Sequence, residues 1–237
     1  DTIALVRELQ SHGIVFIAST MIGMEYHKPA DMEELIHWAV AHEADFHQFM
    51  LYHGVPGTPL YKKLEEGGRL ISREEIPWPD FHGMVRFNYR HPHFKEGEET
   101  QYLFDSFKRD FDINGPSLAR TIRTALKGWQ KHKNHPSPHV RERYKWGARY
   151  LTTLLAAAVW AMRKWYKQDK TNQVVLGKLN ALLHDLKEEL GMISRMAAPL
   201  LGWIVYIGLK REAGKLEAGW ICDPPTFYEP AKGENTI

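Results

Sequence analysis

The chain has 237 residues, 43% of them hydrophobic and 25% charged, which is the composition of an ordinary globular protein. Its formal net charge of +2 argues for no particular class of partner, and a single cysteine, Cys222, excludes a disulfide framework. We therefore expect a reducing compartment and a cytoplasmic location. The length fits one large domain or two modest ones.

The chain begins with a helix-like segment and then a strand, a helix and a second strand. Ile14–Gly23 is a near-continuous apolar run, which is typical of a strand covered on both faces. Asp31 is a candidate N-cap of the next helix, in which apolar residues recur at helical spacing as far as Val40. Phe46–Tyr52 is the second strand. This order predicts a βαβ unit with parallel strands.

Alternation assigns the side chains of each strand to two faces. One face of the two strands is expected to carry Ser19, Met21, Gly23, Gln48, Met50 and Tyr52. Ligands of α/β sheets and barrels bind beyond the carboxyl ends of the strands, here the segments Gly23–His27 and Tyr52–Pro59. Gly54 and Pro56 allow a tight turn close to a ligand, although such a turn can equally be architectural.

Several of these segments resemble one enzyme family. Ser19–Gly23, the helix after it, Gln48-Phe49 and Pro56-Gly57-Thr58-Pro59-Leu60-Tyr61 look like the later barrel strands of a radical S-adenosylmethionine enzyme, in the branch with an N-terminal cobalamin-binding domain. The resemblance includes Tyr89–Phe94 and continues through Asn114–Ser117. It implies an α/β fold followed by α: the C-terminal portion of a partial (β/α) TIM-like barrel over residues 1–94, then a C-terminal helical bundle with an extended tail over residues 95–237.

The resemblance also implies where S-adenosylmethionine and the substrate bind. The implied binding residues are Ser19, Met21, Gly23, Gln48, Tyr52, Gly54 and Pro56. Ser19 and Met21 stand where the family has Gly and Ile in a Gly-x-Ile-x-Gly strand whose middle residue touches the adenine. The alternatives are a packed barrel strand at Ser19 and Met21, and a Gln48 that only bonds neighbouring strands.

The radical chemistry of that family needs cofactors that this sequence does not hold by itself. A 4Fe-4S cluster is bound by closely spaced cysteine thiolates, three of them in this family, and the sequence has one cysteine. The Asp-x-His-x-x-Gly type of loop expected of a family cobalamin domain is missing. We interpret the chain as the C-terminal part of such an enzyme, with the upstream part of the same enzyme supplying the cluster and any cobalamin. Alone it is expected to be inactive, and the resemblance implies cobalamin-dependent methyl transfer on a small-molecule or lipid-like substrate.

Histidine is frequent, with 13 in the sequence. Zinc needs three or four converging ligands, and neither HExxH nor a Cys/His ladder appears. His91 and His93 alone do not make a zinc site, so we predict no metal site. His53, at the mouth of the second strand, is the candidate for a catalytic role in proton transfer.

From Glu98 onwards the sequence pattern is helical. Helices are predicted over Gln101–Phe111, from Asn114 or Ser117 to Trp129, over Val140–Gln168, and from Thr171 or Asn172 to Leu190. Ile193–Lys210 is apolar but is interrupted by Arg195 and Pro199, so we expect a buried or interface helix rather than a membrane span. The tail from Asp223 onwards is expected to be extended or disordered.

Residues 108–149 contain eleven basic side chains against three acidic ones. A basic face can bind nucleic acid or an anionic lipid surface. No RNA-binding motif accompanies it, so nucleic acid is not favoured and a solvated face paired with carboxylates is the simpler expectation. The alternative function is a non-catalytic module that uses these helices to dock nucleic acid, a membrane surface or a partner chain.

Overall fold

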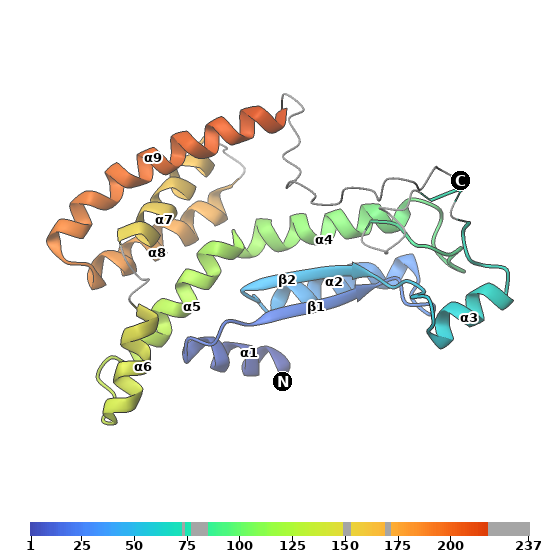
Figure 1. Ribbon diagram of the computed structural model, residues 1–237, viewed down its shortest axis with the longest axis horizontal. Helices are drawn as coiled ribbons and strands as arrows, with labels where there is room; N and C mark the ends of the chain where they lie inside the picture. Colours follow the sequence, from blue (N-terminus) through green and yellow to red (C-terminus); the bar gives the residue numbers. More distant parts are fainter. Residues whose placement is uncertain (73, 77–84, 149–152, 169–171, 218–237) are drawn as a thin grey trace, which may run out of the picture.

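The computed structural model describes residues 1–72, 74–76, 85–148, 153–168 and 172–217. These residues form α1 (Thr2–Ser11), β1 (Ile17–Ile22), η1 (Pro29–Asp31), α2 (Met32–Ala41), β2 (Phe46–Leu51), α3 (Pro59–Glu66), α4 (Glu98–Asn114), α5 (Ser117–His132), α6 (Pro138–Ala148), α7 (Thr153–Tyr166), α8 (Gln173–Glu189) and α9 (Met192–Glu217). Figure 1 shows the strands and α2 beside α4, with α7, α8 and α9 together beyond the junction of α4 and α5.

The two strands pair in parallel and are connected through α2. Their register runs from Ile17 opposite Phe46 to Ile22 opposite Leu51. The predicted βαβ unit is therefore confirmed, with strands somewhat shorter than the apolar runs. Within the described residues the sheet has these two strands only, so the barrel itself stays a prediction.

The two faces of this sheet have different environments. Ile22, Phe49 and Leu51 are buried in one cluster with residues of α2 and α4. On the other face Ile17 is 63% exposed and Met21 is 47% exposed. The prediction of a first strand covered on both faces is therefore wrong for the described chain. The run does place apolar side chains on both faces of the strand. No layer among the described residues packs against the second face.

Asp31 is the N-cap residue of α2, as predicted, but its side chain does not bond to the helix. Its carboxylate accepts a hydrogen bond from the backbone N–H of Lys28 at 2.8 Å, and its side chain makes no capping bond to the helix. Residues Pro29–Asp31 instead form a 3-10 turn that leads directly into α2. The carboxylate thus closes the turn before the helix, because an Asp side chain readily bonds nearby backbone in non-helical conformations.

A second hydrophobic core lies among α5, α7, α8 and α9. Its buried residues include Ile122, Leu126, Val159, Leu179 and Leu186. The predicted helix to Leu190 is confirmed as α8. The predicted single helix Val140–Gln168 corresponds to α6 and α7, on either side of residues 149–152, which lie outside the described residues. Its continuity is therefore untested.

Of the two alternatives expected for the apolar segment Ile193–Lys210, a buried helix is wrong, and an interface helix stays a prediction. The segment belongs to α9, and only 17% of its most apolar window is buried. Among the described helices α9 is the one whose length and composition would allow it to cross a membrane. Predictions that concern residues 77–84, Cys222 or the tail from Asp223 fall outside the described residues.

Candidate functional site

The open face of the sheet brings four of the polar and thioether side chains together. Parallel register sets Ser19 opposite Gln48 and Met21 opposite Met50. Ser19 Oγ donates a hydrogen bond to Gln48 Oε1 across 3.3 Å. We call these four residues the open-face set. The predicted alternation of faces is confirmed at all four, since Thr20, Ile22, Phe49 and Leu51 lie on the packed face.

Gly23, at the carboxyl end of β1, is buried and has a φ of 73°. A Cβ atom there would overlap the ring of Phe87. The hydroxyl of Tyr89 donates to the Gly23 carbonyl at 3.1 Å, and burial raises the pKa of Tyr89, so the phenol keeps its proton. Gly23 therefore closes the strand against Phe87 and Tyr89, and its role here is architectural.

The loop after Gly23 is held by two histidines. His91 Nε2 lies 3.1 Å from the Met24 carbonyl, while its Nδ1 accepts from the backbone N–H of His93 at 3.1 Å. This pair of contacts assigns the proton to Nε2. His27 Nδ1 accepts from the Met24 N–H at 3.2 Å. Burial lowers the pKa of both His27 and His91, so both rings are neutral near pH 7 and act as fixed hydrogen-bonding groups.

The loop after β2 is held by Asn88. Its Oδ1 accepts from Gly54 N–H at 3.0 Å and its Nδ2 donates to the Gly54 carbonyl at 2.7 Å. Tyr52 continues the ladder, donating its N–H to the Ile22 carbonyl at 2.8 Å. His53 is half-buried, and its Nδ1 lies 3.2 Å from the Leu51 carbonyl. Pro56 is exposed at the turn. The segment Asn88–His91 thus holds the loops beyond both strands.

A charged cluster lies at the same end of the sheet. Glu25 accepts hydrogen bonds from Lys63, at 2.9 Å, and from Arg69. These bonds from Lys63 and Arg69 lower the pKa of Glu25, so its carboxylate is charged at neutral pH.

A cavity of about 270 Å³ is lined by Arg86, Phe87, Tyr89, His91 and Glu99 among other residues of this region. Phe87, Tyr89 and His91 therefore line this cavity and also contact the loop after β1.

A second cavity, of about 250 Å³, lies along β1. It is lined mainly by apolar atoms of α1, β1 and α2, including Leu5, Phe16, Ile17 and Trp38. Ser19 and Thr20 both border it, so this cavity follows the edge of β1 and touches both faces of the strand. The exposed edge and face of β1 are of the kind that another strand or chain covers in folded proteins.

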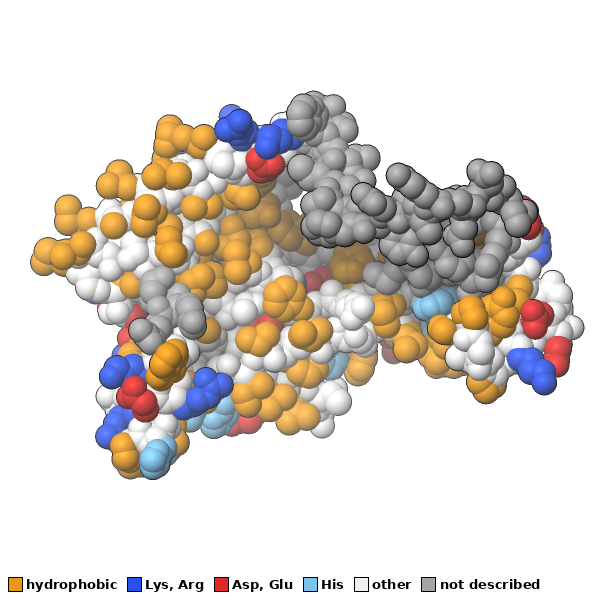
Figure 2. Space-filling model, in the orientation of Figure 1, with side chains coloured by type: hydrophobic (Ala, Val, Ile, Leu, Met, Phe, Trp, Pro, Cys, Tyr) orange, Lys and Arg blue, Asp and Glu red, His pale blue; other side chains and the backbone are white. Residues whose placement is uncertain are grey.

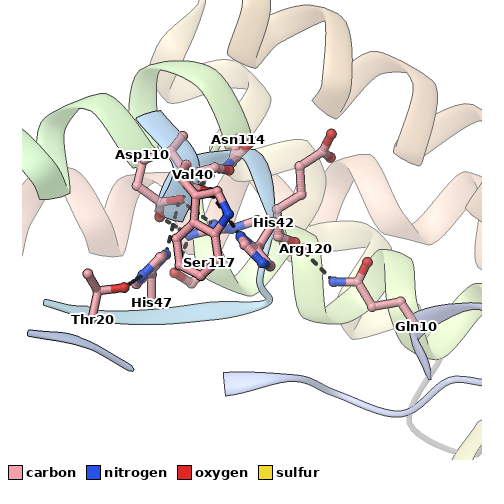
Figure 3. Close-up of polar contacts among 11 residues, drawn as sticks. Gln10, Thr20, Val40, His42, His47, Asp110, Asn114, Ser117 and Arg120 are labelled. Carbon is pink, nitrogen blue, oxygen red and sulfur yellow. Dashed lines mark hydrogen bonds and ion pairs between the residues drawn. The ribbon is translucent and has the colours of Figure 1, made fainter. Parts of the chain in front are cut away.

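Sequence reasoning missed a buried polar cluster under the packed face (Figure 3). Arg120 donates two hydrogen bonds to the Asp110 carboxylate, at 3.1 and 2.8 Å, and their side chains are 4% and 6% exposed. Asn114 donates to Asp110 and to the Val40 carbonyl, each at 2.9 Å. The cluster ties α4 to α5 and to the end of α2. In the sequence these residues look like ordinary polar positions of two helices, and the pattern does not show that Asp110 pairs with Arg120.

His47 of β2 borders this cluster. Its Nε2 lies 2.9 Å from Thr20 Oγ1, and its Nδ1 lies 4.0 Å from Asp110 Oδ1 without a hydrogen bond (Figure 3). Burial lowers the pKa of His47 to about 4, against the opposite influence of Asp110. The ring stacks on Phe49 with centroids 3.9 Å apart. His47 is therefore a neutral core residue at physiological pH.

Metal ligands and free basic side chains are both scarce at the described positions. Within them, no group of three or more His, Cys, Asp or Glu side chains is arranged to hold a metal ion.

Of the eleven basic residues of 108–149, the members paired with carboxylates are Lys108, Arg109, Arg120, Arg123, Lys131, Lys133 and Lys145. Arg149 lies outside the described residues. This pairing leaves little of the local basic excess free for nucleic acid.

Comparisons with known proteins gave no relative. No family model, no curated protein and no solved structure matches this chain. Function must therefore be argued from the open-face set and the loops beside it.

Proposed function

We propose that the chain is the C-terminal part of a radical S-adenosylmethionine enzyme similar to the cobalamin-dependent class, and that its open sheet face contacts S-adenosylmethionine and a small-molecule or lipid-like substrate. The observation that carries the proposal is the position of Ser19, Met21 and Gln48 on one exposed face of a parallel βαβ unit. The resemblance of these strands to the later strands of that barrel supplies the family.

The open-face set has the chemistry that an adenine nucleoside requires. Met21 and Met50 offer a polarizable apolar surface on which a flat base packs well. Gln48 has an amide with two donors and an acceptor, and the 3.3 Å bond from Ser19 occupies only its oxygen. The polar pair can therefore exchange this long bond for bonds to a ligand. Tyr52, Gly54 and Pro56 belong to the adjoining loop.

The iron–sulfur cluster does not fit this chain. One cysteine in the sequence cannot supply the thiolates of a 4Fe-4S cluster, and the described residues contain no alternative group of ligands. The sequence also lacks the Asp-x-His-x-x-Gly type of loop that is expected of a cobalamin domain in that family. Under the proposal both cofactors are held by the upstream part of the enzyme, and the present chain contributes binding, orientation and exclusion of water.

The test uses the longer gene product that the proposal requires, purified without oxygen and reconstituted with iron and sulfide. The measurement is 5′-deoxyadenosine formed from S-adenosylmethionine under a reductant, with the 237-residue chain as the control. We expect nucleoside from the longer protein and none from this chain alone. A gene product without a three-cysteine segment, or a cluster-loaded protein that forms no nucleoside, would overturn the proposal.

Two variants locate the binding face. Met21→Asp and Gln48→Leu should each raise the KM for S-adenosylmethionine about tenfold, the equivalent of one lost interaction of average strength. Leu118→Asp is the matched control, because Leu118 of α5 is 48% exposed and lies off the sheet. Unchanged KM values in both sheet variants would show that the cofactor does not bind this face.

A further inference from the structure

Helix α9 carries a row of exposed apolar side chains at helical spacing. We call it the α9 stripe: Ile193, Met196, Leu200, Trp203, Ile204 and Ile207. The exposed fraction ranges from 84% at Ile193 to 45% at Ile207. At 1.5 Å rise per residue the stripe is roughly 20 Å long. Figure 2 shows hydrophobic side chains gathered over α9. A contiguous exposed apolar surface of this length marks an interaction site.

The opposite side of α9 is firmly packed. A side chain at Gly202 would collide with Trp160 and the Ala157 carbonyl of α7, so the two helices touch along their backbones. Tyr206 is buried, and its hydroxyl accepts a hydrogen bond from Gln168. The helix is therefore fixed to α7 on one side and open on the other. It cannot cross a bilayer as an isolated span without leaving this packing.

Basic side chains at the C-terminal end of the α9 stripe favour a partner that carries negative charge. Lys210 and Arg211 follow Ile207 by three and four residues, so they continue the same helical face. Gly202 contacts Trp160, and Tyr206 contacts Gln168, so α7 runs parallel to α9. Lys164 in the last turn of α7, and Lys167 just after it, therefore lie at the same end. Figure 2 shows Lys and Arg side chains at the far end of α9.

The sequence Met192–Arg211 contains no acidic residue. Glu212, the first acid after it, pairs with Lys215 at 2.7 Å. An apolar stripe with an exposed Trp and a cationic end matches a lipid surface with anionic headgroups, where the apolar face enters the acyl boundary and long cationic side chains reach the phosphates.

We propose that the α9 stripe lies in the surface of a bilayer containing anionic lipid and attaches the protein peripherally to a membrane. The inference rests on α9 and its packing against α7, and is independent of the proposed enzymatic function.

The test is flotation of the full chain with vesicles of phosphatidylcholine, alone or mixed with phosphatidylglycerol. We expect binding to the mixed vesicles, and a loss of at least about tenfold in Leu200→Glu/Ile204→Glu, because two charges would enter the apolar boundary. Ile113→Glu/Leu118→Glu is the matched control: it makes the same charge change at exposed aliphatic positions of α4 and α5, and should bind like the wild type.

Further measurements separate the sources of binding. Lys210→Gln/Arg211→Gln should reduce the preference for phosphatidylglycerol, because it removes two of the four cations at this end, and should leave the weaker binding to phosphatidylcholine unchanged. A polarity-sensitive fluorophore on Leu200→Cys, in a Cys222→Ser background, should shift to the blue when vesicles are added.

Three results would overturn the proposal: no flotation of the wild type, flotation of the α9 stripe variant equal to the wild type, or a fluorophore that stays in water. A wild-type dimer in sedimentation, dispersed by Leu200→Glu/Ile204→Glu and indifferent to vesicles, would assign the stripe to a second copy of the chain instead. Circular dichroism checks folding, and the fluorophore variant answers the question if the double Glu variant does not fold.

Discussion

The twelve strand residues of the β1–β2 sheet point alternately to a packed face and to an open face, and the two faces have different physical roles. On the packed face Phe49 packs on Phe107 of α4, and His47 stacks on Phe49 beside the buried Asp110–Arg120 pair. On the open face Ser19 and Gln48 share one long hydrogen bond, of 3.3 Å. Stability is therefore concentrated on one face, and the other face is free to bind a ligand or another layer.

This difference can be tested most severely at the buried ion pair. Arg120→Met leaves the Asp110 carboxylate buried without its partner, which should lower the free energy of unfolding by about 3–5 kcal/mol. The double variant Asp110→Leu/Arg120→Met removes both charges and should recover much of that loss. Urea unfolding of the two variants checks the prediction. Equal stability of Arg120→Met and the wild type would mean that the pair is open to water.

The carboxyl end of β1 should be almost as sensitive. Gly23→Ala combines a left-handed backbone with overlap of Phe87, and should cost about 2–4 kcal/mol. Gly57→Ala is the matched control, because Gly57 has a φ of 84° but no atom within 4 Å of an added Cβ. It should lose only the conformational part, about 1–2 kcal/mol. Similar losses in both variants would contradict the close contact with Phe87.

His47 should make the packed face sensitive to acid. Its pKa is near 6.5 in the unfolded chain and is lowered to about 4 in the folded protein. The unfolded state therefore binds the extra proton between these values, so this contribution to stability is complete above pH 6.5 and is lost as the pH falls towards 4. The expected loss from pH 7 to pH 5 is about 2 kcal/mol.

Urea unfolding at the two pH values checks this expectation. His47→Gln should remove most of that difference, whereas His37→Gln, at an exposed position, should not. A pH dependence that is unchanged in His47→Gln would show that other groups control it.

The open face should tolerate substitution. Gln48→Ala should change the free energy of unfolding by less than about 0.5 kcal/mol, because the side chain is exposed and its one bond is long. Its neighbour Phe49 points to the packed face, and Phe49→Ala should cost about 3–5 kcal/mol. Thermal unfolding of this adjacent pair compares the two faces directly. A large loss at Gln48 would mean that the open face is part of the core.

Local sequence patterns predicted the elements well and their surroundings less well. The strands, the crossover helix and α8 followed from hydrophobic periodicity, which is a property of neighbouring residues. Asp31 is the N-cap residue as predicted but makes no side-chain capping bond, and a buried Ile193–Lys210 helix, one of the two alternatives, was wrong. Asp31 had a competing backbone N–H at Lys28, and the apolar segment proved to be packed on one side only.

The candidate site divides in the same way. Alternation alone set Ser19, Met21 and Gln48 on a common face, because successive side chains of a strand point in opposite directions. The sequence did not predict that Tyr89 and His91 hold the loop after Gly23, or that Asn88 holds the loop at Gly54. Those contacts join residues at least 34 positions apart in the chain.

The sequence by itself determined the order of strands and helices, the parallel pairing that a crossover helix imposes, and the residue types on each strand face. Only the tertiary structure decided which of the two strand faces is covered, which carboxylate receives Arg120, and that the apolar side of α9 lies on the surface. The reason is physical: periodicity is local and is written in successive residues, whereas burial and ion pairing depend on which distant segments pack against them.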